Sequence, residues 1–471
     1  MLRAHASALA ALGLMPLSAW AQTQSPGQYP GQNPNQQLGQ PPAQRTEIFL
    51  DAGLGETDNV GLTATGAQSQ TLGEVGVLLD VVRDGPLLQA NLKGDLSYLE
   101  YLEHIYPGQF VGRFDGNASF ALVPDHLKWV LQDDYGNAQV DALTPVDRNN
   151  IESVNVVSTG PDLTVRPSDN SFVRLGARYA LVDYETSPFN SHRLLGTLSV
   201  GDDLSVASSI SLNANVTEIR FQDTTINPDY DRRKFFLRYD TRGARTTISL
   251  DAGVAQVDDT GPYKSKLLAQ LVLSRDLTPF QSVSISGGRQ FTDSADSFQS
   301  LTAGAAGNTV VAPVVGSAGN YLMDYGAAEW RFTGERTRID VSGRWERDAY
   351  TIVATPQQVE NYILEGIPVG LDATRSDIEA RVQRDITPTL AAEVRASYTH
   401  ENFDTLGFID HSVLVGVGLT FKPSSRLQYR VRFDHTVRTP DTVPTTAVAQ
   451  GLGTGYTENR IFLTAVYRLS E

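Results

Sequence analysis

The chain has 471 residues, of which 41% are hydrophobic, and its formal net charge is −16. It has no apolar run of about 18 residues, which excludes a bundle of transmembrane helices, and its lack of cysteine excludes disulfides and thiolate metal sites. The strong negative charge argues against nucleic acid as a partner.

The N-terminal segment carries targeting signals rather than a folded domain. Residues 1–21 resemble a secretory signal peptide, in which Arg3 precedes an apolar stretch and Ala19-Trp20-Ala21 forms the cleavage motif. Residues 22–45 consist mainly of Gln, Pro, Gly and Asn, a composition that predicts a disordered periplasmic tail. This tail is too short to hold the plug domain of a TonB-dependent transporter.

Regular alternation of apolar and polar residues begins near Glu47 and continues to the end of the chain. In the stretch 110–122, Phe110 and Phe120 fall on one side, whereas Arg113 and Asp115 fall on the other. Successive side chains of a strand point to opposite faces. Apolar-out and polar-in alternation in segments of this length is typical of outer-membrane β-barrels.

The number of strands and the lengths of their connections define the expected architecture. About 20 strands (about 18 to 22) are expected, and single-chain bacterial barrels have an even number. Short turns alternate with longer loops, which places both termini in the periplasm. Residues 46–471 are therefore predicted to form one all-β domain, a large antiparallel up-and-down transmembrane β-barrel. A soluble β-sandwich array or a β-solenoid is the alternative, but it does not explain strand length, loop asymmetry and signal peptide together. The short turns are expected near Asp84, Pro124, Asp202, Gly243, Asp276, Gly334, Pro388 and Ser424, and the longer loops at 292–320, 348–372 and 439–455.

The polar side of the strands carries charges of both signs. A basic side chain that faces lipid at the bilayer midplane costs about 2–4 kcal/mol of stability, so the charged side chains are expected to line the lumen. They form either a solvated, self-paired lining or a path on which guanidinium and carboxylate groups hydrogen-bond sugar hydroxyls and carboxylates. A wide barrel can enclose an aqueous channel that long loops partly close. The predicted lumen-lining residues are Lys93, Asp95, Arg113, Asp115, Arg174, Arg178, Arg238, Asp240, Arg338, Arg344, Glu379, Arg381, Glu393, Arg395, Arg430 and Arg432.

The sequence offers no catalytic motif. Its seven histidines are scattered, and the HExxH, GxSxG and phosphate-loop patterns are absent. His400 is adjacent to Glu401, and Asp410 to His411, but neighbours on a strand point to opposite faces and make poor dyads. The acidic loop 223–231 is interpreted as solvated rather than as a calcium site. We therefore expect no enzymatic activity and no cofactor.

Several short motifs in the first half of the chain resemble those of a known family. The motifs are GETDNV at 55–60, WVLQDDYG at 129–136, TPVDRN at 144–149, STGPD at 158–162, and Tyr179 with Asp183-Tyr184-Glu185 and Arg193. On these motifs the chain is similar to the outer-membrane β-barrel porins of exopolysaccharide-biosynthesis and PEP-CTERM gene clusters, the EpsL-like group. The resemblance implies an outer-membrane protein that serves polysaccharide export, and the family has no assigned catalytic residues.

These features together suggest a passive outer-membrane pore for exopolysaccharide. A diffusion porin for small solutes and a closed barrel that acts as a surface anchor or adhesin remain as alternatives. The expected partners are outer-membrane lipid, the polysaccharide in transit, periplasmic export or synthesis components, and the barrel-assembly machinery. Tyr467-Arg468-Leu469 resembles the terminal signal that this machinery reads, although two residues follow it.

Overall fold

The computed structural model describes residues 44–224, 227–258, 263–304, 311–312, 319–351, 370–442 and 453–469. The predicted signal peptide and nearly all of the predicted tail lie outside the described residues. Among the described residues, no helix is both long and apolar enough to cross a membrane.

Twenty antiparallel strands of 12 to 16 residues form the wall. Strands of this length can cross a bilayer even when strongly tilted. Their bounds are β1 Arg45–Thr57, β2 Gln70–Asp84, β3 Leu88–Tyr101, β4 Gln109–Val123, β5 Leu127–Gln139, β6 Ile151–Val165, β7 Ser171–Tyr184, β8 Ser191–Ser205, β9 Ser208–Phe221, β10 Tyr230–Arg242, β11 Thr246–Asp258, β12 Lys264–Thr278, β13 Gln281–Thr292, β15 Tyr321–Thr333, β16 Thr337–Tyr350, β17 Ala373–Thr387, β18 Leu390–Phe403, β19 Phe408–Phe421, β20 Leu427–Thr442 and β21 Tyr456–Arg468.

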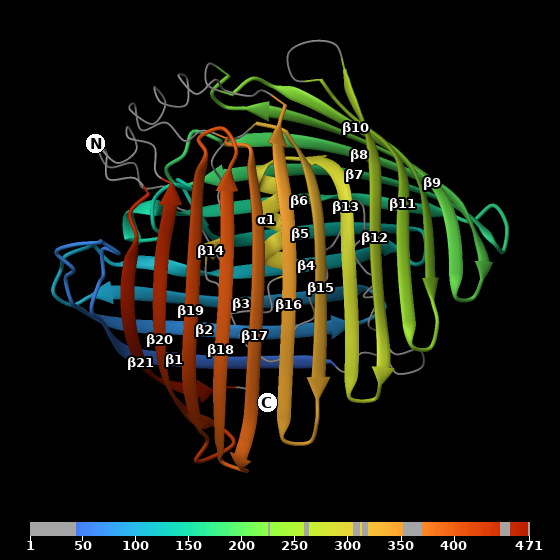
Figure 1. Cartoon of the computed structure of the whole chain (residues 1–471). Helices are drawn as coiled ribbons and strands as arrows, with labels where there is room; N and C mark the ends of the chain where they lie inside the picture. Colours follow the sequence, from blue (N-terminus) through green and yellow to red (C-terminus); the bar gives the residue numbers. More distant parts are fainter. Residues whose placement is uncertain are drawn as a thin grey trace, which may run out of the picture.

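The sheet closes on itself. Each wall strand pairs with its neighbours in sequence, and β1 pairs with β21 from Phe49 opposite Arg468 to Thr57 opposite Arg460. The strands of the front and back walls cross at a steep angle, as expected for tilted strands in a barrel (Figure 1). The predicted fold class, a closed antiparallel barrel of about 20 strands, is confirmed.

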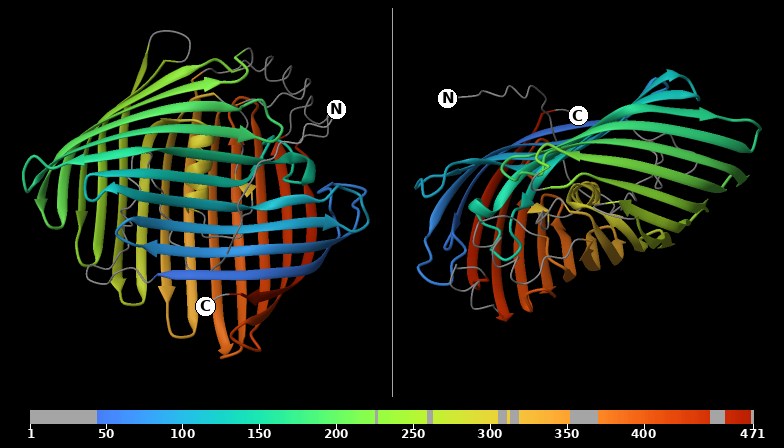
Figure 2. Two further views of the ribbon diagram at one scale, coloured as in Figure 1. Left: turned by 180° about the vertical axis from the view of Figure 1, so that it is seen from behind. Right: turned by 90° about the horizontal axis from the view of Figure 1, so that it is seen from above.

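Three short elements lie outside the wall. The helix α1 (Ser294–Gly304) and the two-residue strand β14 (Val311–Ala312) follow β13, and β13 pairs directly with β15. The 3-10 turn η1 (Arg148–Asn150) lies in the connection between β5 and β6. The view from above shows α1 inside the barrel (Figure 2).

The two ends of the barrel differ as the sequence predicted. Connections at one end are short, such as residues 206–207 and 243–245, whereas the connection at 140–150 belongs to the other end. Arg45 of β1 and Arg468 of β21 both lie at the short-turn end.

One predicted turn was misplaced. Residues 201–203 belong to β8, which continues to Ser205, and the chain reverses at 206–207. The strand extends beyond its apolar part, so polar residues near its end are still paired in the sheet.

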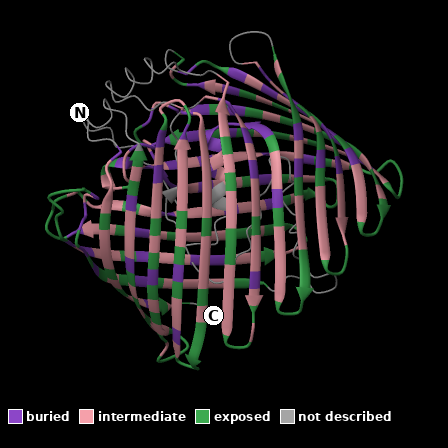
Figure 3. Ribbon diagram, in the orientation of Figure 1, coloured by how far each residue is buried: buried purple, intermediate pink, exposed green. Residues whose placement is uncertain are grey.

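The outer face of the wall is an apolar belt. Phe110 is 67% exposed and Leu122 56% exposed, and both lie on the face of β4 that the alternation predicts to be apolar. Exposed and less exposed residues alternate along many strands (Figure 3). In a membrane protein this exposed apolar surface is the surface that contacts lipid.

Asp133 interrupts the apolar belt on β5. It shares a face with the exposed Trp129 and Leu131, which precede it at two-residue spacing. It lies opposite Gly116 of β4 and Val157 of β6. Its Oδ1 atom is buried and has no hydrogen-bond partner among the described residues. A carboxyl group in this position is expected to cost stability, because lipid offers it no donor.

Replacing Asp133 with leucine is therefore expected to stabilise the barrel by about 1–2 kcal/mol, less than a basic residue costs at the bilayer midplane. Urea unfolding in lipid vesicles would measure the change. Asp183→Leu is the matched control, since Asp183 is exposed on the same outer face but lies beyond the apolar stretch of β7, and this substitution should bring no gain. A loss of stability at Asp133→Leu would contradict the prediction and show that the carboxyl group meets a donor from another chain.

Candidate permeation pathway

The position of α1 identifies the inner face of the wall. Arg193 of β8, Arg232 of β10 and Asp134 of β5 all hydrogen-bond side chains of α1 or of its N-cap. Directly paired residues on neighbouring strands share a face, so the register carries this assignment around the barrel. All sixteen predicted lumen residues lie on the inner face by this register, and whether they contact a solute stays a prediction.

A buried cluster holds the start of α1 against the wall. Arg193 Nη1 donates to both carboxylate oxygens of Asp293 at 3.1 and 3.0 Å, and to Asp296 Oδ1 at 2.8 Å. Arg232 Nη2 donates to Asp296 Oδ2 at 2.5 Å. The Tyr230 hydroxyl donates to Asp293 Oδ2 at 2.7 Å. We call these five residues the docking cluster, in which two guanidinium groups balance two carboxylates.

Asp293 also caps the helix. Its Oδ1 accepts from the backbone N–H of Asp296 at 3.0 Å, which satisfies one of the free donors in the first turn. Burial opposes ionisation of this carboxyl group, but Arg193 and Arg232 outweigh it and hold the pKa of Asp293 well below its usual range. Asp293 therefore stays ionised and paired with the two guanidinium groups at neutral and mildly acidic pH.

An apolar core lies between α1 and one side of the barrel. Phe298 packs close to Gly136 of β5, where a Cβ would lie 3.3 Å from the ring. Gln299 Nε2 donates to Asp134 Oδ2 at 2.8 Å, which fixes a second part of the helix to β5. The helix is thus held to the β5–β12 side of the lumen. The core comprises Ala138, Val154, Val156, Val182, Tyr184, Phe189, Ile219, Phe221, Tyr230, Phe236, Ala255, Val257, Leu268, Phe291, Ala295 and Phe298.

The wall on the other side, β15–β21 and β1–β3, has inward ion pairs. Asp434 joins two of the predicted residues, since it lies 2.8 Å from Arg395 Nη2 and 2.9 Å from Arg432 Nε. Arg381 is 3.8 Å from Glu379 and 4.0 Å from Glu393. The predicted charges are therefore partly self-paired.

The remaining predicted residues divide into three groups. Several are paired with residues that the sequence analysis did not select: Arg344 with Glu346, Arg178 with Asp162, and Arg238 with Asp251. Arg174 lies over the ring of Phe172 at 4.0 Å. Within the described part of the chain, the ion pairs within 4.0 Å do not include Lys93, Asp95, Arg113, Asp115, Asp240, Arg338 or Arg430.

The loop between β5 and β6 reaches the opposite wall at the long-loop end. The carbonyl oxygen of Leu143 accepts from Gly453 N–H at 2.9 Å and from Arg438 Nη2 at 3.3 Å. The loop keeps its shape because Asn150 Nδ2 donates to three loop carbonyls at 2.8–3.1 Å. We call the apolar contact the mouth cluster, and it comprises Ala142, Leu143, Leu371, Phe403 and Phe408.

His400 and His411, which the sequence analysis considered as members of dyads, lie on the outer face of the wall. His400 Nδ1 is 3.2 Å from His411 Nδ1, and His411 Nε2 is 2.9 Å from Asp441 Oδ2. Glu401 points inward to Arg375 instead, as the alternation rule predicted. The described residues contain no group of three or more His, Asp or Glu side chains that could hold a metal ion.

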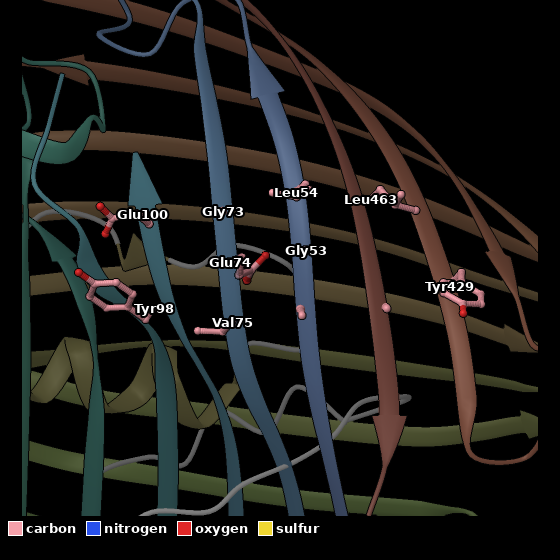
Figure 4. A pocket seen from close by; sticks show the side chains of 11 residues that line it. Gly53, Leu54, Gly73, Glu74, Val75, Tyr98, Glu100, Tyr429 and Leu463 are labelled. Carbon is pink, nitrogen blue, oxygen red and sulfur yellow. The ribbon is translucent and has the colours of Figure 1, made fainter. Parts of the chain in front are cut away.

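A shallow apolar groove lies on the outer surface where β1 and β21 meet. Leu54, Val75, Tyr98, Tyr429 and Leu463 line it (Figure 4). These side chains belong to the outer face of their strands, and all five are exposed. The groove therefore faces lipid and is not part of the pathway through the barrel.

No family model and no curated protein matches the sequence. Among solved structures, the chain is similar to the siderophore receptor PirA from Acinetobacter baumannii, with 7% identity, a TM-score of 0.50, and coverage of 91% of this chain and 81% of that chain. It is also similar to PirA from Pseudomonas aeruginosa (10% identity, TM-score 0.45, coverage 92% and 81%). A third similar structure is the outer membrane channel DcaP of Acinetobacter baumannii (7% identity, TM-score 0.37, coverage 90% and 96%). At these identities the likeness shows fold alone, and the chain has the fold of an outer-membrane β-barrel.

Proposed function

We propose that this barrel is a passive outer-membrane pore through which a secreted polysaccharide leaves the cell. The observation that carries the proposal is the asymmetry of the lumen. The helix α1 is packed on the β5–β12 side, whereas the facing wall presents rows of arginine and carboxylate side chains. Such a surface offers a hydroxyl-rich polymer many hydrogen-bond partners.

The ion pairs suit a pathway along which a polymer slides. Asp434 orients Arg432, whose side chain is partly exposed, so this guanidinium group can donate to a passing polymer without a large loss of conformational freedom. Many weak contacts along the wall favour movement, because each contact can be exchanged for the next as the polymer advances. The proposal assigns no enzymatic step to the barrel, and polymer synthesis would supply the drive. The short turns and both ends of the barrel domain would lie in the periplasm.

Deleting the gene is expected to lower the polysaccharide outside the cells and to raise it in the periplasm. Both amounts can be measured by quantifying the polymer in culture medium and in periplasmic extracts, with complementation by the wild-type gene as the control. Unchanged export in the deletion strain would overturn the proposal.

Passage of small solutes is the second candidate function. The loop at 140–150 crosses to the opposite wall and α1 occupies part of the lumen, and both features narrow the path. Liposome swelling with sugars of increasing length would distinguish the two functions. A sharp cutoff at small sugars, together with normal polymer export in the deletion strain, would favour the diffusion porin.

A further inference from the structure

An aromatic ring lies on the inner wall where the barrel closes. Phe462 is on the inner face of β21, and its ring lies across Gly53 and Gly55 of β1. A Cβ at Gly53 would be 2.7 Å from Phe462 Cε1, and one at Gly55 would be closer still. The two glycines therefore let the ring lie against the backbone. The ring also packs against the apolar cluster of Val60, Leu72 and Tyr101 while remaining only half-buried.

Three arginines border this ring on one side. Arg432 of β20 is paired directly with Phe462, and Arg460 precedes Phe462 by two residues on the same face of β21. Arg430 lies one step further along the inner face of β20. Arg395, Arg430 and Arg460 all add to the positive potential at Arg432. Three guanidinium groups therefore lie near the Phe462 ring.

Only part of this positive charge is neutralised within the protein. Asp434 lies between Arg395 and Arg432, at 2.8 and 2.9 Å. Among the ion pairs of the described residues, none involves Arg430 or Arg460. Both side chains are half-buried, so their N–H groups remain accessible from the lumen. Asp51 and Asp95 interact with Arg430 at longer range, but within the described residues neither Arg430 nor Arg460 has a carboxylate within 4.0 Å, so both can bind an anionic ligand.

A carboxylate lies on the other side of the ring. Arg430, Thr464, Gly53 and Glu74 form one cross-strand row over β20, β21, β1 and β2. The two middle residues are small, and three strand spacings separate the backbones at the ends of the row by about 14 Å. The Phe462 ring covers Gly53 in this row, so the ring lies between a cation and a carboxylate, and Glu74 forms no ion pair within the described part of the chain.

The combination is chemically specific. An aromatic face packs against the C–H face of a sugar ring, guanidinium groups bind a carboxylate with paired hydrogen bonds, and a carboxylate accepts from sugar hydroxyls. A neutral sugar would not need the arginines, and a free phosphate would not need the ring. We infer that Phe462, Arg430, Arg432, Arg460 and Glu74 form a luminal sugar site for a uronic-acid unit of a glycan. This inference rests on the proposed function and names the polymer as acidic.

Calorimetry with the full-length protein in detergent tests the site, with trigalacturonate as the probe and maltotriose and inorganic phosphate as comparisons. We expect saturable binding of trigalacturonate and much weaker binding of the other two. The double variant R430Q/R460Q should weaken trigalacturonate binding roughly tenfold or more, because each substitution removes a charged donor. The variant Phe462→Leu should weaken it several-fold while leaving the arginines in place.

The matched control is K266Q, which removes an exposed cation from the inner face of β12 on the other side of the barrel. It should leave binding unchanged. Retained heat-modifiable mobility in gels will show that each variant is folded. Equal binding of trigalacturonate and maltotriose, equal binding of phosphate, or unchanged binding by R430Q/R460Q would each overturn the site.

These outcomes separate the site from the proposed function. If export is lost in the deletion strain but the purified protein does not bind trigalacturonate, the sugar site is ruled out and the export pore is retained. If the purified protein binds trigalacturonate but export is normal in the deletion strain, the export function is ruled out and the luminal acidic-sugar site is retained.

Discussion

Replacing both Asp293 and Asp296 with asparagine is expected to release α1 from the wall and to raise single-channel conductance. The substitutions leave Arg193 and Arg232, which are 5% and 4% exposed, without their carboxylate partners. Breaking a buried ion pair from one side costs about 3–5 kcal/mol, which exceeds what a few helix contacts recover. A helix is about 10 Å wide with its side chains, so we expect conductance to rise roughly twofold.

The double variant D293N/D296N removes the negative charge of both carboxylates but keeps a side chain that can cap the helix. Asparagine at position 293 can still accept the Asp296 N–H bond at the helix start, so the helix itself is not the part that fails. Asp251→Asn is the control, because Asp251 forms an equally buried pair with Arg238 on the same side of the barrel. That variant should lose stability without a rise in conductance. Unchanged conductance in D293N/D296N would show that α1 does not limit the pathway.

The orientation of the wall side chains was predictable because every strand has one face toward lipid and one toward the lumen, so apolar and polar residues alternate along it. Phe110 and Phe120 face outward and Arg113 and Asp115 inward, as their spacing indicated. The rule failed at Val154 and Val156, which are fully buried on the inner face of β6. Apolar residues face inward there because a helix from a distant part of the chain packs on them.

The contacts inside the barrel were not predictable because they join residues that are far apart in the sequence. Arg193 meets Asp293 across 100 residues of sequence, and Gln299 meets Asp134 across 165. No local pattern encodes such contacts. The stretch 292–320 was expected to be a long loop, but the structure places α1 and β14 in it. The spacing of Asp293 and Asp296 suits the first turn of a helix and is a local sign of α1. Alternation along the strands likewise placed charges on the inner face but did not identify Asp434 as the partner of Arg395 and Arg432.

Replacing Leu143 with aspartate is expected to detach the β5–β6 loop from the opposite wall. Leu143 is 3% exposed within the mouth cluster, and a carboxylate there would be buried among Phe403, Phe408 and Leu371. An unpaired charge in apolar surroundings costs more than the loop contacts return, so the loop should leave its position and hydrate. Liposome swelling should then show uptake of longer linear sugars than in the wild type.

Val146→Asp is the matched control for this prediction. Val146 lies in the same loop and is 40% exposed, so the same change of charge is made where water already reaches the side chain. Limited trypsin digestion gives a second readout, because Arg148 lies in η1 at the end of this loop. Cleavage there should accelerate in L143D and not in V146D. If L143D becomes protease-sensitive but its sugar cutoff stays the same, the loop crosses the mouth without restricting it, and the constriction lies deeper, at α1.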